Sequence, residues 1–205
     1  MTTKDAIRYA LGLADGASLP AIDRMADAPL TFPTAHGGCH PLWVVGHLAV
    51  VEGMLTAMLT EGPSPTSRWE PLFGQESEAT ADAGRYPTYD EVRATFRTLR
   101  RENLERLEAM TDADLERATP FQPTGLETHF DTVGKALLTV ALHQTMHRGQ
   151  VTDAIRAAGW QVAKPAVAAW RVYSCSVLGI GSGSLRARVM TSCQSGPGKP
   201  ASSVG

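Results

Sequence analysis

The sequence predicts an all-α protein, a four-helix bundle in which a long crossover connection joins the second and third helices. Three observations support this fold class. Four segments repeat apolar residues at helical spacing. No segment alternates polar and apolar residues over the length of a strand. A long stretch that contains four prolines and three glycines, residues 61–87, separates the second helix from the third, as in bundles with one crossover.

The first predicted helix covers about residues 3–25. Pro20 is expected to bend or interrupt it, because proline has no amide hydrogen to donate. The second covers about residues 41–60 and follows the sequence GGCH, which is typical of a turn. Pro41 then occupies the first helical position, where a missing N–H does no harm.

This second helix, PLWVVGHLAVVEGMLTAML, is apolar enough to be mistaken for a membrane span. It contains His47, Glu52 and two glycines, and its apolar residues are expected to favour one side, with Glu52 and Thr56 facing away from His47. We therefore interpret it as a buried helix of a soluble bundle.

The third helix begins at TYDE, where Thr88 can cap the helix and Glu91 can reach back in a capping box. A discontinuous apolar stripe follows, formed by Val92, Phe96, Leu99, Leu104 and Leu107. The sequence TDADLERA predicts a short extra turn before the fourth helix. That helix covers about residues 131–158 and stops at Gly159.

The chain is predicted to consist of one helical domain, residues 1–163, and a Gly/Ser-rich tail, residues 164–205. From Arg171 onward there is no Asp or Glu. The tail is interpreted as flexible, and is either a natural disordered end or a frameshifted or fused one. Within the long connection, the apolar sequence WEPLFG predicts a loop that packs back onto the bundle.

The formal net charge of −2 argues against a nucleic-acid-binding protein. Three widely spaced cysteines without a CxxC pair argue against a disulfide framework or a cysteine-rich zinc site. The first residues, MTTKDAIRYALGLADG, lack the apolar core of a secretory signal. We therefore expect a cytoplasmic protein that acts on a small molecule, with neither nucleic acid nor membrane as a partner.

Two histidines in LHQTMHRGQ, His143 and His147, lie four positions apart and project from the same face of the fourth helix. Around them the apolar pattern places both imidazoles in the middle of the buried face. His47 occupies the same kind of position in the second helix. Spacing alone leaves two interpretations open: core imidazoles with hydrogen-bond partners, or three ligands of one divalent metal ion, as in catalytic zinc sites.

Other residues bear on the kind of site that these histidines form. Gln144 follows His143 where an HExxH protease would have its catalytic Glu, so peptidase chemistry is not expected. Cys39 is interpreted as a small residue in a glycine-rich turn rather than a nucleophile. Three more histidines are interpreted as caps or surface residues, with His40 a candidate for the mouth of a pocket; they are His36, His40 and His129.

The sequences GGCHPLWVVGHLAVVEG, LFG, YPTYDEV and TVGKALLTVALHQTMHRGQVTDAIRAAG together resemble the DinB-like (DinB/YfiT) superfamily. The resemblance covers about residues 3–163, and GHL combined with HxxxHRGQ is its most specific part. It implies a four-helix bundle, often dimeric, with a divalent metal ion, usually zinc or nickel. The ligands that it implies are His47, His143 and His147, the same three that the periodicity indicates.

The resemblance also implies an activity, since characterised members include thiol-dependent transferases and isomerases, although many others have no assigned reaction. We therefore expect a metal-dependent S-transferase, isomerase or hydrolase that uses a low-molecular-weight thiol or water as nucleophile. Gln150 orients a ligand, holds a histidine by a hydrogen bond, or packs at a helix interface. Arg148 either meets an anionic thiol or is a solvated charge. The alternative function is a stress-related bundle protein that does not catalyse a reaction.

Overall fold

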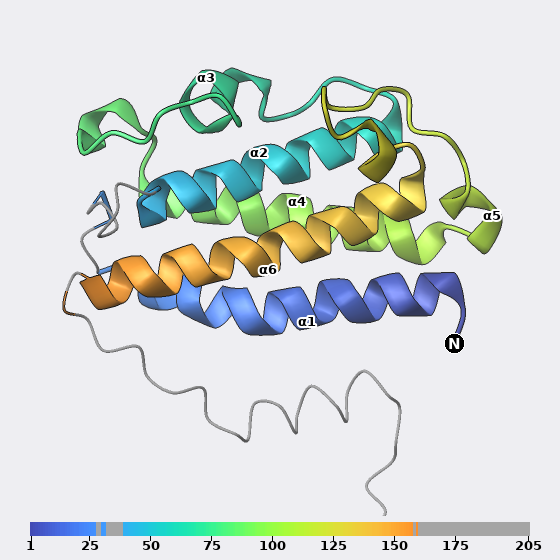
Figure 1. Cartoon of the computed structure of the whole chain (residues 1–205), viewed down its shortest axis with the longest axis horizontal. Coiled ribbons are helices and arrows are strands. Elements are labelled where there is room, and N and C mark those ends of the chain that lie inside the picture. The colour runs from blue at the N-terminus through green and yellow to red at the C-terminus, as the bar shows by residue number, and fades with distance from the viewer. Residues whose placement is uncertain (28–29, 32–38, 158, 160–205) are drawn as a thin grey trace, which may run out of the picture. The chain divides into compact units, whose positions relative to one another are not determined.

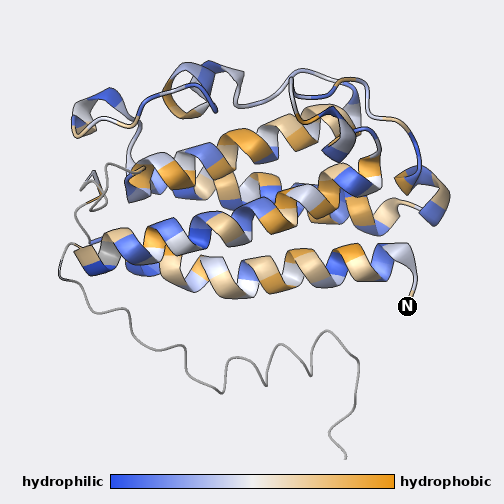
Figure 2. Cartoon of the chain, in the orientation of Figure 1, coloured by the Kyte–Doolittle hydropathy of each residue, from blue (hydrophilic) through white to orange (hydrophobic). Residues whose placement is uncertain are grey.

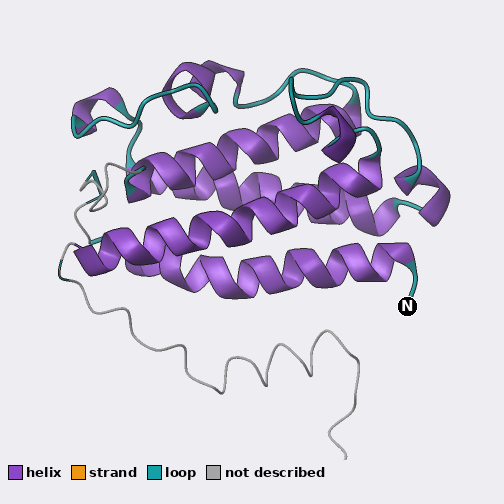
Figure 3. Ribbon diagram, in the orientation of Figure 1, coloured by secondary structure: helices purple, strands orange, loops and turns teal. Residues whose placement is uncertain are grey.

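The computed structural model describes residues 1–27, 30–31, 39–157 and 159, and the regular structure of these ranges is helical (Figure 3). The four long helices are α1 (Thr3–Arg24), α2 (Pro41–Thr60), α4 (Tyr89–Ala109) and α6 (Val133–Ala157). The two short ones are α3 (Glu70–Phe73) and α5 (Asp112–Leu115). Three 3₁₀ turns lie at Ser67–Trp69, Ala83–Arg85 and Glu127–His129. The predicted all-α class is confirmed, because these ranges contain one isolated β-bridge, between Ala118 and Thr132, and no strand.

The four long helices lie side by side, and each packs against two others (Figure 1). α2 contacts α4 and α6, while α1 contacts α6 and α4. In Figure 1, α2 and α4 run from left to right, and α1 and α6 run from right to left. The connection between α2 and α4, which contains α3, therefore returns along the molecule before α4 begins.

α2 is buried on all sides rather than on one. Of its 20 residues, every one except Val51, Met54 and Thr60 is buried, including Glu52 and Thr56. The expectation that its apolar residues favour one side is therefore wrong. Its composition would suit a membrane span, but 89% of its most apolar window is buried inside the protein, as in the core helix of a soluble protein. Hydrophobic residues recur along the neighbouring long helices as well (Figure 2).

The ends of the helices follow from local capping residues. At α2, Pro41 lies in the first turn as predicted, and the His40 Nδ1 accepts a hydrogen bond of 3.0 Å from the Trp43 amide. At α4, the Thr88 hydroxyl accepts from the Glu91 amide, as predicted. The Glu91 carboxylate does not complete the capping box; it lies 3.4 Å from Arg68 instead. α6 is followed by Gly159, whose φ of +77° suits a helix-ending glycine.

α1 continues through Pro20 to Arg24, so the helix is not interrupted there. Proline removes the hydrogen bond to the carbonyl four residues earlier, which belongs to the exposed Gly16. An exposed carbonyl can bond to water, so the lost bond is tolerated there. The predicted short turn before α6 is present as α5, with Thr111 and Asp114 in a capping box. The predicted boundary after residue 163 and the tail beyond it lie outside the described residues.

Candidate metal centre

The three predicted histidines lie together where α2 and α6 are neighbours. The Nε2 atom of His143 lies 3.2 Å from that of His47 and 3.0 Å from that of His147. One ligand atom from each ring can be chosen so that all three lie within 4.8 Å of one another. We call these residues the histidine trio. Their convergence joins residues that are 96 positions apart in the chain.

Two members of the trio have their ring orientation fixed by a second hydrogen bond. The Nδ1 of His47 lies 2.7 Å from the Phe73 carbonyl oxygen, and the Nδ1 of His147 lies 2.7 Å from the Gln150 side-chain oxygen. Both oxygens can only accept, so each Nδ1 carries the hydrogen and donates it. In a neutral imidazole this leaves the Nε2 lone pair free. Two lone pairs are thereby aimed at the Nε2 of His143.

Burial keeps the trio neutral near pH 7. It lowers the pKa of His47 to about 4, against a smaller opposing effect of the bond to Phe73. It also lowers the pKa of His143 to about 3, and the neighbouring rings of His147 and His47 lower it further. The pKa of His147 is lowered by burial too, although its bond to Gln150 opposes the shift. Neutral imidazoles are the form that binds metal ions.

The donor set fits a divalent cation. At the usual Zn–N length of about 2.0–2.1 Å, two nitrogens on one tetrahedral ion lie about 3.3 Å apart, close to the Nε2 separations of 3.2 Å and 3.0 Å. Without a cation, the single hydrogen of His143 Nε2 can satisfy only one of its two neighbours. The lone pair of the other neighbour would then face a nitrogen that has no second hydrogen to donate to it. Three nitrogen ligands would leave at least one coordination position open.

The connection after α2 contacts the first two turns of this helix at three polar points. The Phe73 carbonyl accepts from His47, the Ser77 hydroxyl accepts from the Trp43 indole at 2.9 Å, and the Thr80 carbonyl accepts from His40 at 2.8 Å. The indole of Trp43 also stacks on the His47 ring, with centroids 4.7 Å apart. The predicted packing of WEPLFG onto the helices is confirmed, since Trp69 and Phe73 are buried.

Gly46 permits this arrangement, because the Phe73 ring lies directly over it. A Cβ atom built at Gly46 would lie 2.3 Å from two carbons of that ring. Any side chain here would displace Phe73 and with it the carbonyl that orients His47. The approaching residue, Phe73, ends the short helix α3.

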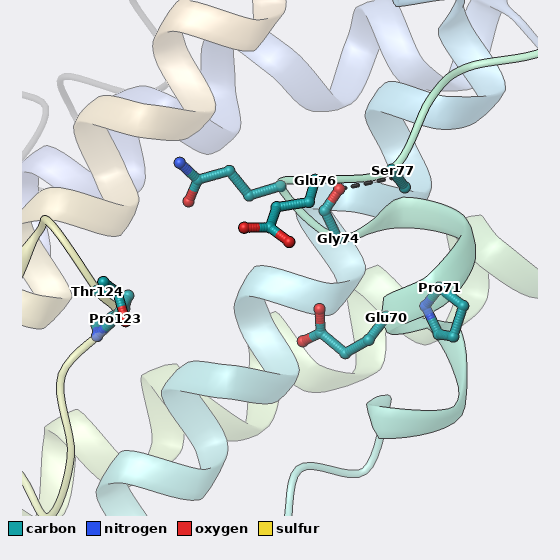
Figure 4. Close-up of a pocket in the computed structure, with 8 residues that line it drawn as sticks. Glu70, Pro71, Gly74, Glu76, Ser77, Pro123 and Thr124 are labelled. Carbon is teal, nitrogen blue, oxygen red and sulfur yellow. Dashed lines mark hydrogen bonds between the residues drawn. The ribbon is translucent and has the colours of Figure 1, made fainter.

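A pocket of about 590 Å³ adjoins the same connection (Figure 4). Its walls come from the segment after α2 and from the segment before α6, and they are Glu70, Pro71, Gly74, Gln75, Glu76, Ser77, Pro123 and Thr124. The Gly74 carbonyl, next to Phe73 in the chain, lies 2.8 Å from the Ser77 hydroxyl. Two carboxylates and no basic side chain line this pocket, so it favours ligand groups that donate hydrogen bonds or carry positive charge.

The remaining candidates lie outside the trio. Cys39 is half-buried, and burial raises the pKa of its thiol, so it is not activated as a nucleophile. His40 is buried as the cap of α2 and is absent from the pocket wall, and His129 lies exposed at a 3₁₀ turn. Arg148 is exposed. His36 lies outside the described residues.

The sequence missed the polar residues of the helix interior. It placed His143 and His147 in the middle of the buried face, but both are half-buried, and Gln144 is the fully buried residue between them. The sequence also placed Glu52 on the side of the helix opposite His47, without indicating that its carboxylate is buried against α4. A charged residue within an otherwise apolar helix was the available signal for a buried polar contact.

Two neighbouring helices of this protein bring three neutral imidazoles together. This fold and this site define a class of helical proteins with a candidate metal site. Residues 11–151 match the family model of the DinB superfamily. This match covers more than half of the chain and includes the whole trio, so the chain belongs to the DinB superfamily. The resemblance seen in the sequence is confirmed. A comparison with curated proteins gave no match.

Proposed function

We propose that the protein binds one divalent metal ion, zinc or nickel, through the Nε2 atoms of His47, His143 and His147. The observation that carries this proposal is the approach of His143 Nε2 to two lone pairs whose direction is fixed by Phe73 and Gln150. Such hydrogen bonds to the outer nitrogen are the usual support of metal-binding histidines. The four long helices are proposed to form the family's four-helix bundle, with the connection that contains α3 as the crossover.

We further propose that the protein is a metal-dependent enzyme that transfers or rearranges groups through a low-molecular-weight thiol, or hydrolyses a substrate with water. When bound, the metal would supply Lewis acidity and make a coordinating thiol or water a stronger acid. The chain's own residues would orient the ligand nitrogens, and the Trp43 ring would cover one face of His47. The pocket beside Gly74 is proposed to receive a hydrogen-bond-donating part of the substrate.

One observation favours the alternative, a stress-related metal-binding protein without catalysis. Within the described residues, the candidate metal group consists of three histidines and includes no carboxylate that could act as a general base. For the partners and the location we propose what the sequence led us to expect: a small-molecule substrate, no nucleic acid, no membrane and a cytoplasmic protein.

A homodimer is proposed to form through the outer face of α6. Three large apolar side chains, spaced four residues apart, lie exposed there, namely Leu138, Leu142 and Met146. Residues at this spacing share one face of a helix. An exposed apolar stripe of this kind is typical of an interaction surface.

The metal content of protein purified without a histidine tag tests the proposal. We expect about one equivalent of zinc or nickel in the wild type, and loss of most of it in His143→Ala. His129→Ala, which removes an exposed histidine outside the trio, should retain the metal. Equal metal content in all three proteins would contradict the site. Loaded protein is then assayed with thiols and electrophiles, and bound metal without thiol-dependent turnover or hydrolysis would favour the alternative.

A further inference from the structure

A cluster of buried polar side chains joins all four long helices beside the trio. Its members, which we call the Arg100 cluster, are Asp15 of α1, Glu52 of α2, Arg100 and Asn103 of α4, and Gln144 of α6. Each of them is buried, and Gln144 has no exposed surface. Gln144 directly follows His143, so this cluster reaches the backbone that carries a member of the trio.

Gln144 uses both ends of its amide in this cluster. Its side-chain nitrogen donates a hydrogen bond of 3.0 Å to Asp15, and its side-chain oxygen accepts one from Arg100. Arg100 also pairs with Glu52 at 3.1 Å, and its Nε lies 3.4 Å from Asp15. α6 is therefore tied through one side chain to α1 and α4, and through Arg100 to α2.

His143 is the member of the trio that needs such support. His47 and His147 have hydrogen-bond partners at Nδ1, whereas the Nδ1 of His143 is buried and has no partner among the described residues. No hydrogen bond at the outer nitrogen therefore orients its ring. The position of the His143 ring must instead follow from the rotation of α6 about its axis, which Gln144 sets.

We propose that Gln144, held by Arg100 and Asp15, is the positioning residue for His143 in the metal centre. The inference rests on the proposed metal function and adds a residue to it. Gln144 does not contact the metal in this proposal. It fixes the rotation of α6, so that the Nε2 of His143 meets the lone pairs of His47 and His147.

The experiment measures Co²⁺ binding to the full chain, by affinity and by the ligand-field absorption bands. In Gln144→Met the side chain keeps its approximate volume but loses both hydrogen bonds. We expect Co²⁺ to bind about 10–100-fold more weakly, the range seen when outer support of metal ligands is removed. The absorption bands should shift, because the ligand geometry relaxes.

Two further variants separate positioning from general stability. Leu137→Ala removes a fully buried side chain seven residues earlier on the same face of α6, so it destabilises the helix packing without touching the cluster. Its Co²⁺ affinity and bands should stay near those of the wild type. The double variant Asp15→Asn, Gln144→Glu exchanges donor and acceptor between the two residues and keeps the formal charge, so it should restore most of the affinity.

The outcomes discriminate between the two proposals. Wild-type affinity and bands in Gln144→Met would overturn the positioning role alone. An equal loss in Leu137→Ala would also overturn it, because the effect would then follow stability. A wild-type protein that binds no Co²⁺ would overturn the metal site, and the positioning role with it.

Discussion

His143 and His47 carry pKa values far below the usual 6.5 of an unfolded histidine. The unfolded chain therefore binds more protons than the folded chain between about pH 6.5 and pH 3. By linkage, the free energy of unfolding must fall as the pH falls through this window. The same neutral histidines that suit a metal ion therefore make the stability of the metal-free protein fall in acid.

We predict that metal-free protein, kept with a chelator, loses on the order of a few kcal/mol of stability between pH 7 and pH 4. Urea titrations at several pH values would measure this. His143→Leu should flatten the slope, because it removes one of the two strongly shifted groups. The exposed His129→Gln should leave the slope unchanged, and a flat wild-type profile would contradict the assigned burial effect.

The sequence indicated the trio through the spacing of His143 and His147 on one helix face and the place of His47 among apolar residues, and the family resemblance implied the same three residues. The tautomers could not be predicted. They depend on the Phe73 carbonyl, which belongs to a connection whose path no local pattern specifies. Gln150 is an intermediate case: its position three residues after His147 made a bond conceivable, and the structure contains that bond.

At the scale of the elements, the contact between α2 and α3 depends on a single glycine. Gly46→Ala should force the Phe73 ring aside, at a cost of about 1–3 kcal/mol for overpacking. It should also weaken metal binding, because the ring and the carbonyl acceptor of His47 belong to the same residue. Denaturant unfolding and metal titration would measure the two effects.

Gly149→Ala is the matched control for that substitution. It lies in a helix as well, but a Cβ atom there would have no neighbour within 4 Å. Because alanine favours a helix over glycine, this variant should gain up to about 1 kcal/mol and keep its metal. If both variants behaved alike, the close approach of Phe73 would not matter.

The helix boundaries themselves were largely readable from the sequence. Thr88, Pro41 and Gly159 each act as predicted, because capping depends on one residue and its nearest backbone. The exceptions involve tertiary partners. Glu91 pairs with Arg68 instead of closing the capping box. α2 is buried all round because Glu52 and Thr56, which the sequence placed on an outer side, contact Arg100 and Asn103 of α4.

At the scale of the whole molecule, the Arg100 cluster places two carboxylates and one guanidinium inside the protein. Burial raises the pKa of Glu52, while Arg100 and Asn103 oppose that shift. Arg100 is the shared partner of both carboxylates, Asp15 and Glu52, so the loss of Arg100 would leave both without a cation. No sequence pattern predicts this cluster, because it depends on the rotation of four helices about their axes at once.

We predict that Arg100→Met destabilises the protein by about 3–5 kcal/mol near pH 7, because Asp15 and Glu52 lose their cation. The neighbouring Arg101 provides the control. Its pair with Glu105 is about two-thirds exposed on each side, so Arg101→Met should cost less than about 1 kcal/mol. Unfolding free energies of the two variants would be compared, and similar costs would argue against a buried cluster.

The proposed homodimer makes a further prediction at this scale. Met146 and Leu142 are 74% and 59% exposed, so glutamates at both positions should be tolerated by the fold and should prevent association. Light scattering after size-exclusion chromatography should show a dimer for the wild type and a monomer for Leu142→Glu, Met146→Glu. Arg148→Glu, which changes the charge of the same helix by the same two units, should remain dimeric. A monomeric wild type would contradict the proposed homodimer.

The three polar contacts between the connection and α2, at His40, Trp43 and His47, bear on protein engineering. A designer who grafted the trio onto another scaffold with two helices alone would reproduce the meeting of the rings. Without the Phe73 carbonyl, either ring nitrogen of His47 could face the other two histidines. The portable unit must therefore include the stretch from residue 73 to residue 80, and swapping that stretch between relatives would offer a way to retune the site without altering any ligand.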